Sequence, residues 1–364
     1  MELKIPDYIN QIAPYVPGKP IETLEREYGV ADSIKLASNE NPLGPSPKAL
    51  AAVAAAMAKL HRYPDGAGYV LLQRLADFLA VDRDQIVLGN GSDDILGLLA
   101  RVLLQPGDEV LIPSPSFLMY KIVAQCAGAV PVAVPLKALR TDLEALLQKV
   151  GARTRLIFIC NPNNPTGTVV GQDAFENFLQ ALPANVVVVL DEAYVEFVRQ
   201  PSCASGLQYL NGPVPVVTLR TFSKVYGLAG LRVGYGVMPT VLAELLNRVR
   251  MPFNVNSLAQ VAAVAALDDT AFFNQTLETV HQGLDFLYAE LARRNLRFFP
   301  SETNFLLIDV GRPADNVFEG LLRRGVIVRS MVSYGFPTFI RVNVGLPAEN
   351  QRFLNALDHV LSKG

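Results

Sequence analysis

Short apolar runs alternate with segments of helical periodicity over the first two thirds of the chain. The apolar runs cover residues 85–89, 109–113, 130–134, 155–160, 186–191 and 214–220, and residues 232–238 predict one more strand. Because these runs are nearly continuous in apolar residues, they predict strands that are buried on both faces. Residues 93–104 and 175–182 have the periodicity of amphipathic helices. This alternation predicts an α/β fold with a mostly parallel sheet of seven strands flanked by helices.

The pattern changes after about residue 265. A long helical stretch at 272–294 leads into short apolar runs at 305–310, 325–330 and 339–345, as in a small α+β domain. The first thirty residues are rich in Pro and Tyr and have no place in the large sheet. We therefore expect a large domain over residues 31–265, and a second unit formed by an N-terminal arm, 1–30, together with a small C-terminal domain, 266–364.

Composition excludes several classes of protein. The 364 residues carry a formal net charge of -2, which gives no basic field for nucleic acid or an anionic membrane. Three scattered cysteines and three scattered histidines lack the spacing of a disulfide framework or a metal site. The N-terminus shows no signal-peptide pattern. We expect a cytoplasmic protein with no metal, no nucleic-acid partner and no membrane span.

Ligands of open parallel sheets bind beyond the carboxyl ends of the strands, so the residues that follow each strand are candidates for a site. The first such turn, GNGSDD (89–94), places Gly91 before a helix that starts near Ser92. Free N–H groups at a helix start suit a phosphate. The alternative is a plain helix start, with Ser92 as the cap and Asp93 and Asp94 favoured by the helix dipole. The turn lacks the GxGxxG pattern of dinucleotide-binding proteins.

Two further turns supply an aromatic ring and an amide. Phe117, in PSPSFLMY (113–120), follows a proline-stiffened turn and can lie flat on a planar ligand, or be a core or rim aromatic. Asn164, in NPNNPTG (161–167), offers an amide at the functional edge of the sheet, or belongs to a turn that is simply well built.

The last two turns supply charges. Asp191 ends a run of aliphatic residues, where a carboxylate is costly unless it meets a cationic partner or caps the next element. Tyr194 follows three residues later. Lys224, in TFSKVYGLAGLR (221–232), follows a strand; Thr221 and Arg232 beside it suit a phosphate. The alternative for Lys224 is a solvated surface lysine.

A lysine, a buried acid and a phosphate turn together suit pyridoxal 5′-phosphate, which needs an amine and a partner for its ring nitrogen. Six segments, in order over nearly the whole chain, resemble the fold-type I aminotransferases, and among them most the histidinol-phosphate aminotransferase family. They are LASNENPLGPSP (36–47), HRYPDGAGYVLLQRLA (61–76), NPNNPTG (161–167), DEAYVEF (191–197), TFSKVYGLAGLRVGYG (221–236) and IRVNVG (340–345).

The resemblance implies that Lys224 binds pyridoxal 5′-phosphate covalently and that Asp191 pairs with its ring nitrogen. Tyr194 and Asn164 would bind the ring hydroxyl, and Phe117, where many relatives have tyrosine, would stack on the ring. The phosphate would be held by Gly91, Ser92, Asp93, Thr221 and Arg232, with Tyr63 reaching it across a homodimer interface.

The resemblance also implies the substrates. The expected reaction converts histidinol phosphate and 2-oxoglutarate into imidazole acetol phosphate and glutamate, in histidine biosynthesis. Arg341, beside Asn39, would bind the substrate carboxylate, and Arg329 with Tyr15 of the N-terminal arm would recognise the distal phosphate. Aromatic amino acid aminotransferases and threonine-phosphate decarboxylases share most of these segments and remain alternatives.

The proposed chemistry sets an expectation for the catalytic lysine. A free lysine has a pKa of about 10.4, and a catalytic one needs about 7–8. Burial and the charge of Arg232 should both lower the pKa of Lys224.

Overall fold

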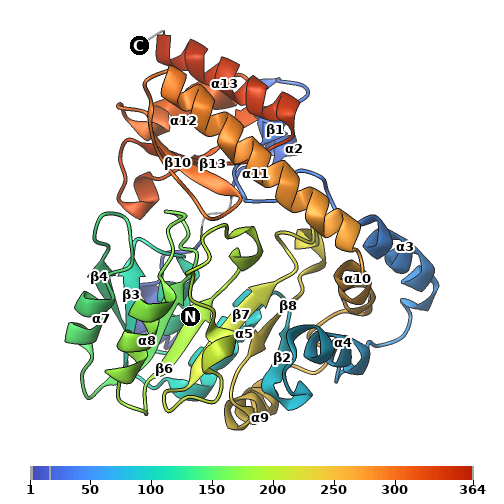
Figure 1. Ribbon diagram of the computed structural model, residues 1–364, viewed down its shortest axis with the longest axis vertical. Coiled ribbons are helices and arrows are strands. Elements are labelled where there is room, and N and C mark those ends of the chain that lie inside the picture. The colour runs from blue at the N-terminus through green and yellow to red at the C-terminus, as the bar shows by residue number, and fades with distance from the viewer. Residues whose placement is uncertain (1–2, 16–17, 363–364) are drawn as a thin grey trace.

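A seven-stranded sheet lies at the centre of the larger unit of the computed structural model, which describes residues 3–15 and 18–362 (Figure 1). Its strand order is β2-β8-β7-β6-β5-β3-β4, and only β8 runs antiparallel to its neighbours. The strands are β2 (Ile86–Gly89), β3 (Glu109–Ser114), β4 (Val130–Pro135), β5 (Thr154–Cys160), β6 (Val187–Asp191), β7 (Val216–Thr221) and β8 (Gly234–Val237). The predicted mostly parallel sheet is confirmed.

Helices cover the sheet on both faces. One face packs against α5 (Ser92–Leu103), α6 (Met119–Cys126) and α9 (Thr240–Val249), and the other against α7 (Leu143–Lys149) and α8 (Gln172–Gln180). Beside β2 and β8 lie α3 (Pro47–Ala56), α4 (Tyr69–Leu79) and α10 (Ser257–Leu267) (Figure 1). The expectation that every strand is buried on both faces is wrong for β4. This strand lies at the sheet edge, where Val130 is 46% exposed.

A second, smaller unit follows along the chain. It starts with α11 (Thr270–Arg293) and contains an antiparallel sheet with the order β12-β13-β10-β9. Its other elements are β9 (Arg297–Phe299), β10 (Phe305–Asp309), α12 (Ala314–Leu322), β11 (Val326–Ile327), β12 (Arg329–Ser330), β13 (Phe339–Asn343) and α13 (Pro347–Ser362). The single strand expected at 325–330 is instead two, because β11 pairs with β1 (Ile34–Lys35) and β12 pairs with β13.

The N-terminal arm contacts both units. Leu24 of α2 (Ile21–Tyr28) packs against Leu322 and Ile327 of the smaller unit, whereas α1 (Asp7–Asn10) lies against α6.

Short 3-10 helices lie at Met57–Lys59, Arg83–Gln85, Val195–Phe197, Gly206–Tyr209, Ala229–Leu231 and Val332–Tyr334. The domain division at residues 31 and 266 stays a prediction, although the pairing of β1 with β11 places residues 34–35 against the smaller unit. None of the helices in the described ranges has the length and apolar character that crossing a bilayer requires.

Candidate active site

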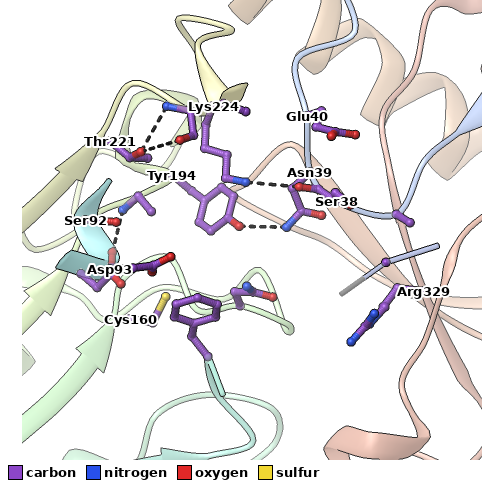
Figure 2. Close-up of a pocket in the computed structure, with 18 of the residues that line it drawn as sticks. Ser38, Asn39, Glu40, Ser92, Asp93, Cys160, Tyr194, Thr221, Lys224 and Arg329 are labelled. Atoms are coloured by element: carbon purple, nitrogen blue, oxygen red, sulfur yellow. Dashed lines mark hydrogen bonds between the residues drawn. The ribbon is translucent and has the colours of Figure 1, made fainter. Parts of the chain in front are cut away.

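A cavity of about 260 Å³ lies where the carboxyl ends of the parallel strands face the smaller unit. Its walls bring together residues from β5, β6 and β7, the start of α5, the segment 37–40, and β12 and β13. All of the residues predicted for the site line this cavity except Gly91 and Tyr63. Figure 2 shows the lysine, the tyrosine and the helix start pointing into it from separate elements.

Lys224 comes three residues after the end of β7, and its Nζ donates a hydrogen bond to the carbonyl oxygen of Ser38 at 3.3 Å (Figure 2). The same atom lies 5.6 Å from the centre of the Tyr194 ring. Burial, and after it the positive charge of Arg341, lowers the pKa of Lys224 to about 8. The alternative of a solvated surface lysine is therefore wrong. The expected lowering by Arg232 is present, but Arg341 contributes more.

Asp191 is the last residue of β6 and is 3% exposed. Its Oδ2 accepts a hydrogen bond from the hydroxyl of Tyr120 at 2.7 Å, and its Oδ1 accepts one from the backbone N–H of Ala193 at 3.1 Å. Burial raises the pKa of this carboxyl to about 6, against the hydrogen bond from Tyr120, which lowers it. The alternative in which Asp191 caps the next element is wrong, because the 3-10 helix Val195–Phe197 has Tyr194 as its N-cap and no side-chain cap. Asp191 accepts from the turn that follows β6 and lines the cavity.

Two hydrogen bonds join the large sheet to distant segments inside the cavity. The hydroxyl of Tyr194 accepts a bond from Asn39 Nδ2 at 2.8 Å (Figure 2). Arg341 Nη1 donates to Asn164 Oδ1 at 2.5 Å, and its Nη2 donates to the carbonyl oxygen of Ala37 at 2.9 Å. Within the described residues, Arg341 Nε and Asn39 Oδ1 are buried without a hydrogen-bond partner. A polar ligand in the cavity is the natural partner for such atoms.

The start of α5 lines the end of the cavity where the sequence predicts a phosphate. Gly91 is the N-cap, with φ of +84°, and within the described residues this helix start has no side-chain cap. The alternative in which Ser92 caps the helix is therefore wrong, because Ser92 is already its first residue. Arg232 Nη2 lies 3.8 Å from Asp93 Oδ2. The hydroxyl of Thr221 donates to Ser223 Oγ at 3.0 Å.

The remaining predicted residues line the cavity or lie outside it. Phe117 lines the cavity, and Tyr15 and Arg329 line it from the N-terminal arm and β12. Tyr63 does not line it within one chain. This side chain is 83% exposed and its ring stacks on Phe253 with centroids 4.9 Å apart. Its expected role across a dimer interface stays a prediction.

Sequence reasoning missed several residues of this region. Ser38 supplies the acceptor for the lysine, and Tyr334 and Cys160 line the cavity. Tyr120 donates to Asp191 from outside the cavity wall. It lies in the segment 113–120, three residues after Phe117, and the two rings meet edge to face, but no pattern in the sequence indicated its contact with Asp191.

The cavity suits pyridoxal 5′-phosphate in three respects. A partly neutral lysine amine faces a buried carboxylate that an adjacent cationic ring nitrogen would stabilise in its charged form. The helix start at Ser92, with free N–H groups beside Arg232, suits a phosphate. A Cβ at position 91 would lie 2.6 Å from Arg232 Nη2, so the glycine leaves room for this cation. Among the described residues, no group of three or more His, Cys, Asp or Glu side chains is placed to hold a metal ion.

Comparisons with known proteins identify relatives of the whole chain. Residues 31–357 match the family described as aminotransferase class I and II. The chain is 48% identical to a histidinol-phosphate aminotransferase of Moorella thermoacetica, over 99% of this chain and 93% of that protein. It is 50% identical to histidinol-phosphate aminotransferase 2 of Pseudomonas fluorescens (strain Pf0-1), over 98% of this chain and 97% of that protein. The crystal structure of histidinol-phosphate aminotransferase from Sinorhizobium meliloti, in complex with pyridoxal-5′-phosphate, is similar with a TM-score of 0.92 and 29% identity, covering 100% of this chain and 99% of that one.

Proposed function

Because the chain belongs to the class I and II aminotransferases, and within them to the histidinol-phosphate aminotransferases, we propose that it transfers the amino group of histidinol phosphate to 2-oxoglutarate. The products are imidazole acetol phosphate and glutamate, in a step of histidine biosynthesis. One observation carries the proposal: the amine of Lys224, the buried carboxylate of Asp191 and the guanidinium of Arg341 share one cavity.

The cofactor is pyridoxal 5′-phosphate, which when bound draws electrons from the substrate Cα and so makes the Cα proton removable. Lys224 would bind it covalently, and Asp191 would pair with its ring nitrogen. Tyr194 and Asn164 would bind the ring hydroxyl; the side-chain oxygen of Asn164 accepts from Arg341, which leaves its side-chain N–H₂ as the donor. The phosphate would be held by Gly91, Ser92, Asp93, Thr221 and Arg232, and the ring face would be covered by Phe117.

Lys224 is the group that would move a proton between the substrate Cα and C4′ of the cofactor, from Cα to C4′ in the first half-reaction and from C4′ to Cα in the second. A general base works best when its pKa lies near the working pH. With a pKa of about 8, a useful fraction of Lys224 is neutral under physiological conditions. Neighbouring Tyr194 stays protonated, because burial raises the pKa of its hydroxyl.

Two arginines fit the two unlike substrates. The planar guanidinium group binds either a carboxylate or a phosphate through paired N–H donors. Arg341 has a buried Nε for which the described chain supplies no acceptor, and it would take the carboxylate of glutamate, with Asn39 beside it. Arg329 and Tyr15 line the same cavity and would take the distal phosphate of histidinol phosphate.

The working enzyme is proposed to be a cytoplasmic homodimer. Tyr63, Met251 and Phe253 are apolar side chains that are 83%, 64% and 44% exposed, and Tyr63 stacks on Phe253. A second copy of the chain covering this surface would bring Tyr63 to the phosphate of its neighbour. All three cysteines are free thiols, as a reducing compartment favours. Equilibrium sedimentation of the purified protein tests the dimer.

A substrate panel tests the proposed reaction. The purified protein with cofactor is given glutamate and imidazole acetol phosphate, or glutamate and phenylpyruvate, or phosphothreonine alone. We expect the first pair to react with the highest kcat/KM. Clear preference for phenylpyruvate would instead assign an aromatic amino acid aminotransferase, and carbon dioxide release from phosphothreonine would assign a decarboxylase.

A second experiment tests the amine. Borohydride reduction of the holoenzyme should attach the mass of the cofactor to the peptide that carries Lys224. Lys224→Ala should lose transamination, whereas Lys149→Ala, at an exposed lysine of α7, should keep it. Transamination by Lys224→Ala at the wild-type rate would refute the proposal.

A further inference from the structure

Tyr120 is fully buried at the second position of α6 and does not itself line the cavity, within the described part of the chain. Its ring stacks face to face on Phe158 of β5, with centroids 4.7 Å apart and planes 6° from parallel. The cavity residue Phe117 meets the same ring edge to face at 5.6 Å. Two aromatic contacts therefore fix the ring, and with it the direction of the hydroxyl.

The hydroxyl of Tyr120 is one of two donors that hold Asp191, among the residues that the structure describes. It donates to Oδ2 at 2.7 Å, while the backbone N–H of Ala193 donates to Oδ1 at 3.1 Å. An ionised carboxylate has about four acceptor positions on its two oxygens. Both oxygens thus keep the capacity for a further donor, and Asp191 lines the cavity from which that donor would come.

The surroundings of Asp191 are otherwise unfavourable to its charge. Burial raises its pKa, and the acidic groups that face it, Asp93 from α5 and Glu192 from the following turn, raise it further. The thiol of Cys160 lies beside it from β5. The hydrogen bond from Tyr120 is the first of the influences that act in the opposite direction.

We propose that Tyr120 is a positioning residue of the active site, whose hydroxyl keeps the Asp191 carboxylate ionised and aimed at the ring nitrogen of the cofactor. This inference rests on the proposed function, since it concerns the acid partner of that cofactor. Tyr120 acts through Asp191 and contacts neither substrate nor cofactor itself.

A purely structural role for Tyr120 makes a different prediction. If the residue only fills space between Phe117 and Phe158, phenylalanine keeps both ring contacts and the site is unchanged. If the hydroxyl positions Asp191, Tyr120→Phe alters the carboxylate while the packing stays the same.

Cofactor affinity is the first measurement. The free energy of a hydrogen bond to a charged group corresponds to a factor of about ten or more in a binding constant. Losing the bond from Tyr120 to Asp191 should therefore weaken cofactor binding by about that factor. We expect the dissociation constant of pyridoxal 5′-phosphate, titrated into cofactor-free protein, to rise about tenfold in Tyr120→Phe. The matched control is Tyr209→Phe, which removes a buried hydroxyl that has no hydrogen-bond partner among the described residues. Equal affinity in the two variants overturns the proposal.

The cofactor-free protein gives a second readout. Because the pKa of Asp191 is raised to about 6 in the folded state, the folded protein binds more protons than the unfolded chain between about pH 4 and pH 6. Stability should therefore fall as pH rises through this window. In Tyr120→Phe the fall should extend to higher pH, as followed by urea unfolding across the window. An unchanged pH profile overturns the proposal.

A double substitution separates this inference from the proposed function. In an Asp191→Asn background, adding Tyr120→Phe should change cofactor affinity no more than Tyr209→Phe does. A full additional tenfold loss there would show that Tyr120 acts independently of Asp191 and would overturn the proposal. If the wild-type protein itself fails to transaminate, the proposed function falls, while the unfolding profiles still decide whether Tyr120 controls Asp191.

Discussion

Replacing Lys224 by methionine should stabilise the cofactor-free protein. The pKa of Lys224 falls from 10.5 to about 8 on folding, a difference of about 2.5. At about 1.36 kcal/mol for each pKa unit, burying the charged amine costs about 3.4 kcal/mol at neutral pH. Methionine also loses the hydrogen bond to Ser38, worth about 1 kcal/mol. We expect Lys224→Met to unfold with a free energy about 2 kcal/mol higher than the wild type near pH 7.

The pH dependence of this gain has a definite sign. Between about pH 8 and pH 10.5 the unfolded chain holds the proton of Lys224 more firmly than the folded protein does. Wild-type stability should therefore rise with pH across that window, because the unfolded state binds more protons there. The methionine variant has no such group. Its advantage should be complete below about pH 8 and gone by about pH 10.5.

Urea unfolding of cofactor-free protein, followed by circular dichroism, measures both effects. The cofactor must be removed, because a ligand that binds only the folded state adds stability of its own. Lys149→Met is the control, since this lysine of α7 is exposed and its replacement should change stability by no more than about 0.5 kcal/mol. No gain near pH 7, or a gain that persists above pH 10.5, would refute the reasoning.

Gly91→Ala, with Gly107→Ala as its control, tests the proposed phosphate end of the cavity, and Glu192→Gln tests the buried ion pair with Arg220. Gly91→Ala places a Cβ 2.6 Å from Arg232 Nη2 at φ of +84°, so we expect cofactor affinity to fall about tenfold, by displacement of this cation. Gly107→Ala, at φ of +90° with no atom within 4 Å, should cost about 1 kcal/mol of unfolding free energy and leave affinity unchanged; equal affinities in both variants would contradict this account. Glu192→Gln leaves the guanidinium of Arg220 without the carboxylate that it contacts through Nε and Nη2 at 2.9 and 2.8 Å, so urea unfolding should show a loss of about 3 kcal/mol. A loss below about 1 kcal/mol would place this buried pair with ordinary surface ion pairs.

The large sheet was predictable because its strands are apolar almost without interruption. The run ending at Asp191 and the run ending at Cys160 match β6 and β5 within a residue or two, since each run is bounded by a turn. The pairing of the run at 325–330 was not predictable. Apolar periodicity shows that a segment is extended, but it carries no information on which neighbour it pairs with. In this run, residues 326–327 pair with β1, whereas residues 329–330 pair with β13.

The positions of the site residues followed from the topology, whereas their contacts did not. Parallel strands end at the same edge, so residues that follow them meet there. The bond between Asn39 and Tyr194 joins residues 155 positions apart, and the bond between Arg341 and Asn164 joins residues 177 positions apart. Both depend on how the smaller unit and the segment 37–40 close over the sheet, which no local pattern records. For this reason the sequence pointed to Arg232 as the cation that lowers the pKa of Lys224, whereas in the structure Arg341 of the smaller unit lowers it more.

The contact between Tyr120 and Asp191 shows where sequence reasoning ends for this site. The strand before Tyr120 is β3 and the strand that carries Asp191 is β6, and they are separated in the sheet by β5. A hydroxyl at the start of α6 reaches the end of β6 only because its ring lies across Phe158 of that intervening strand. Such a contact requires the strand order and a side-chain direction, and the apolar pattern of the chain specifies neither. The sequence alone could therefore identify an acid that needs a partner, but not the buried phenol that holds it.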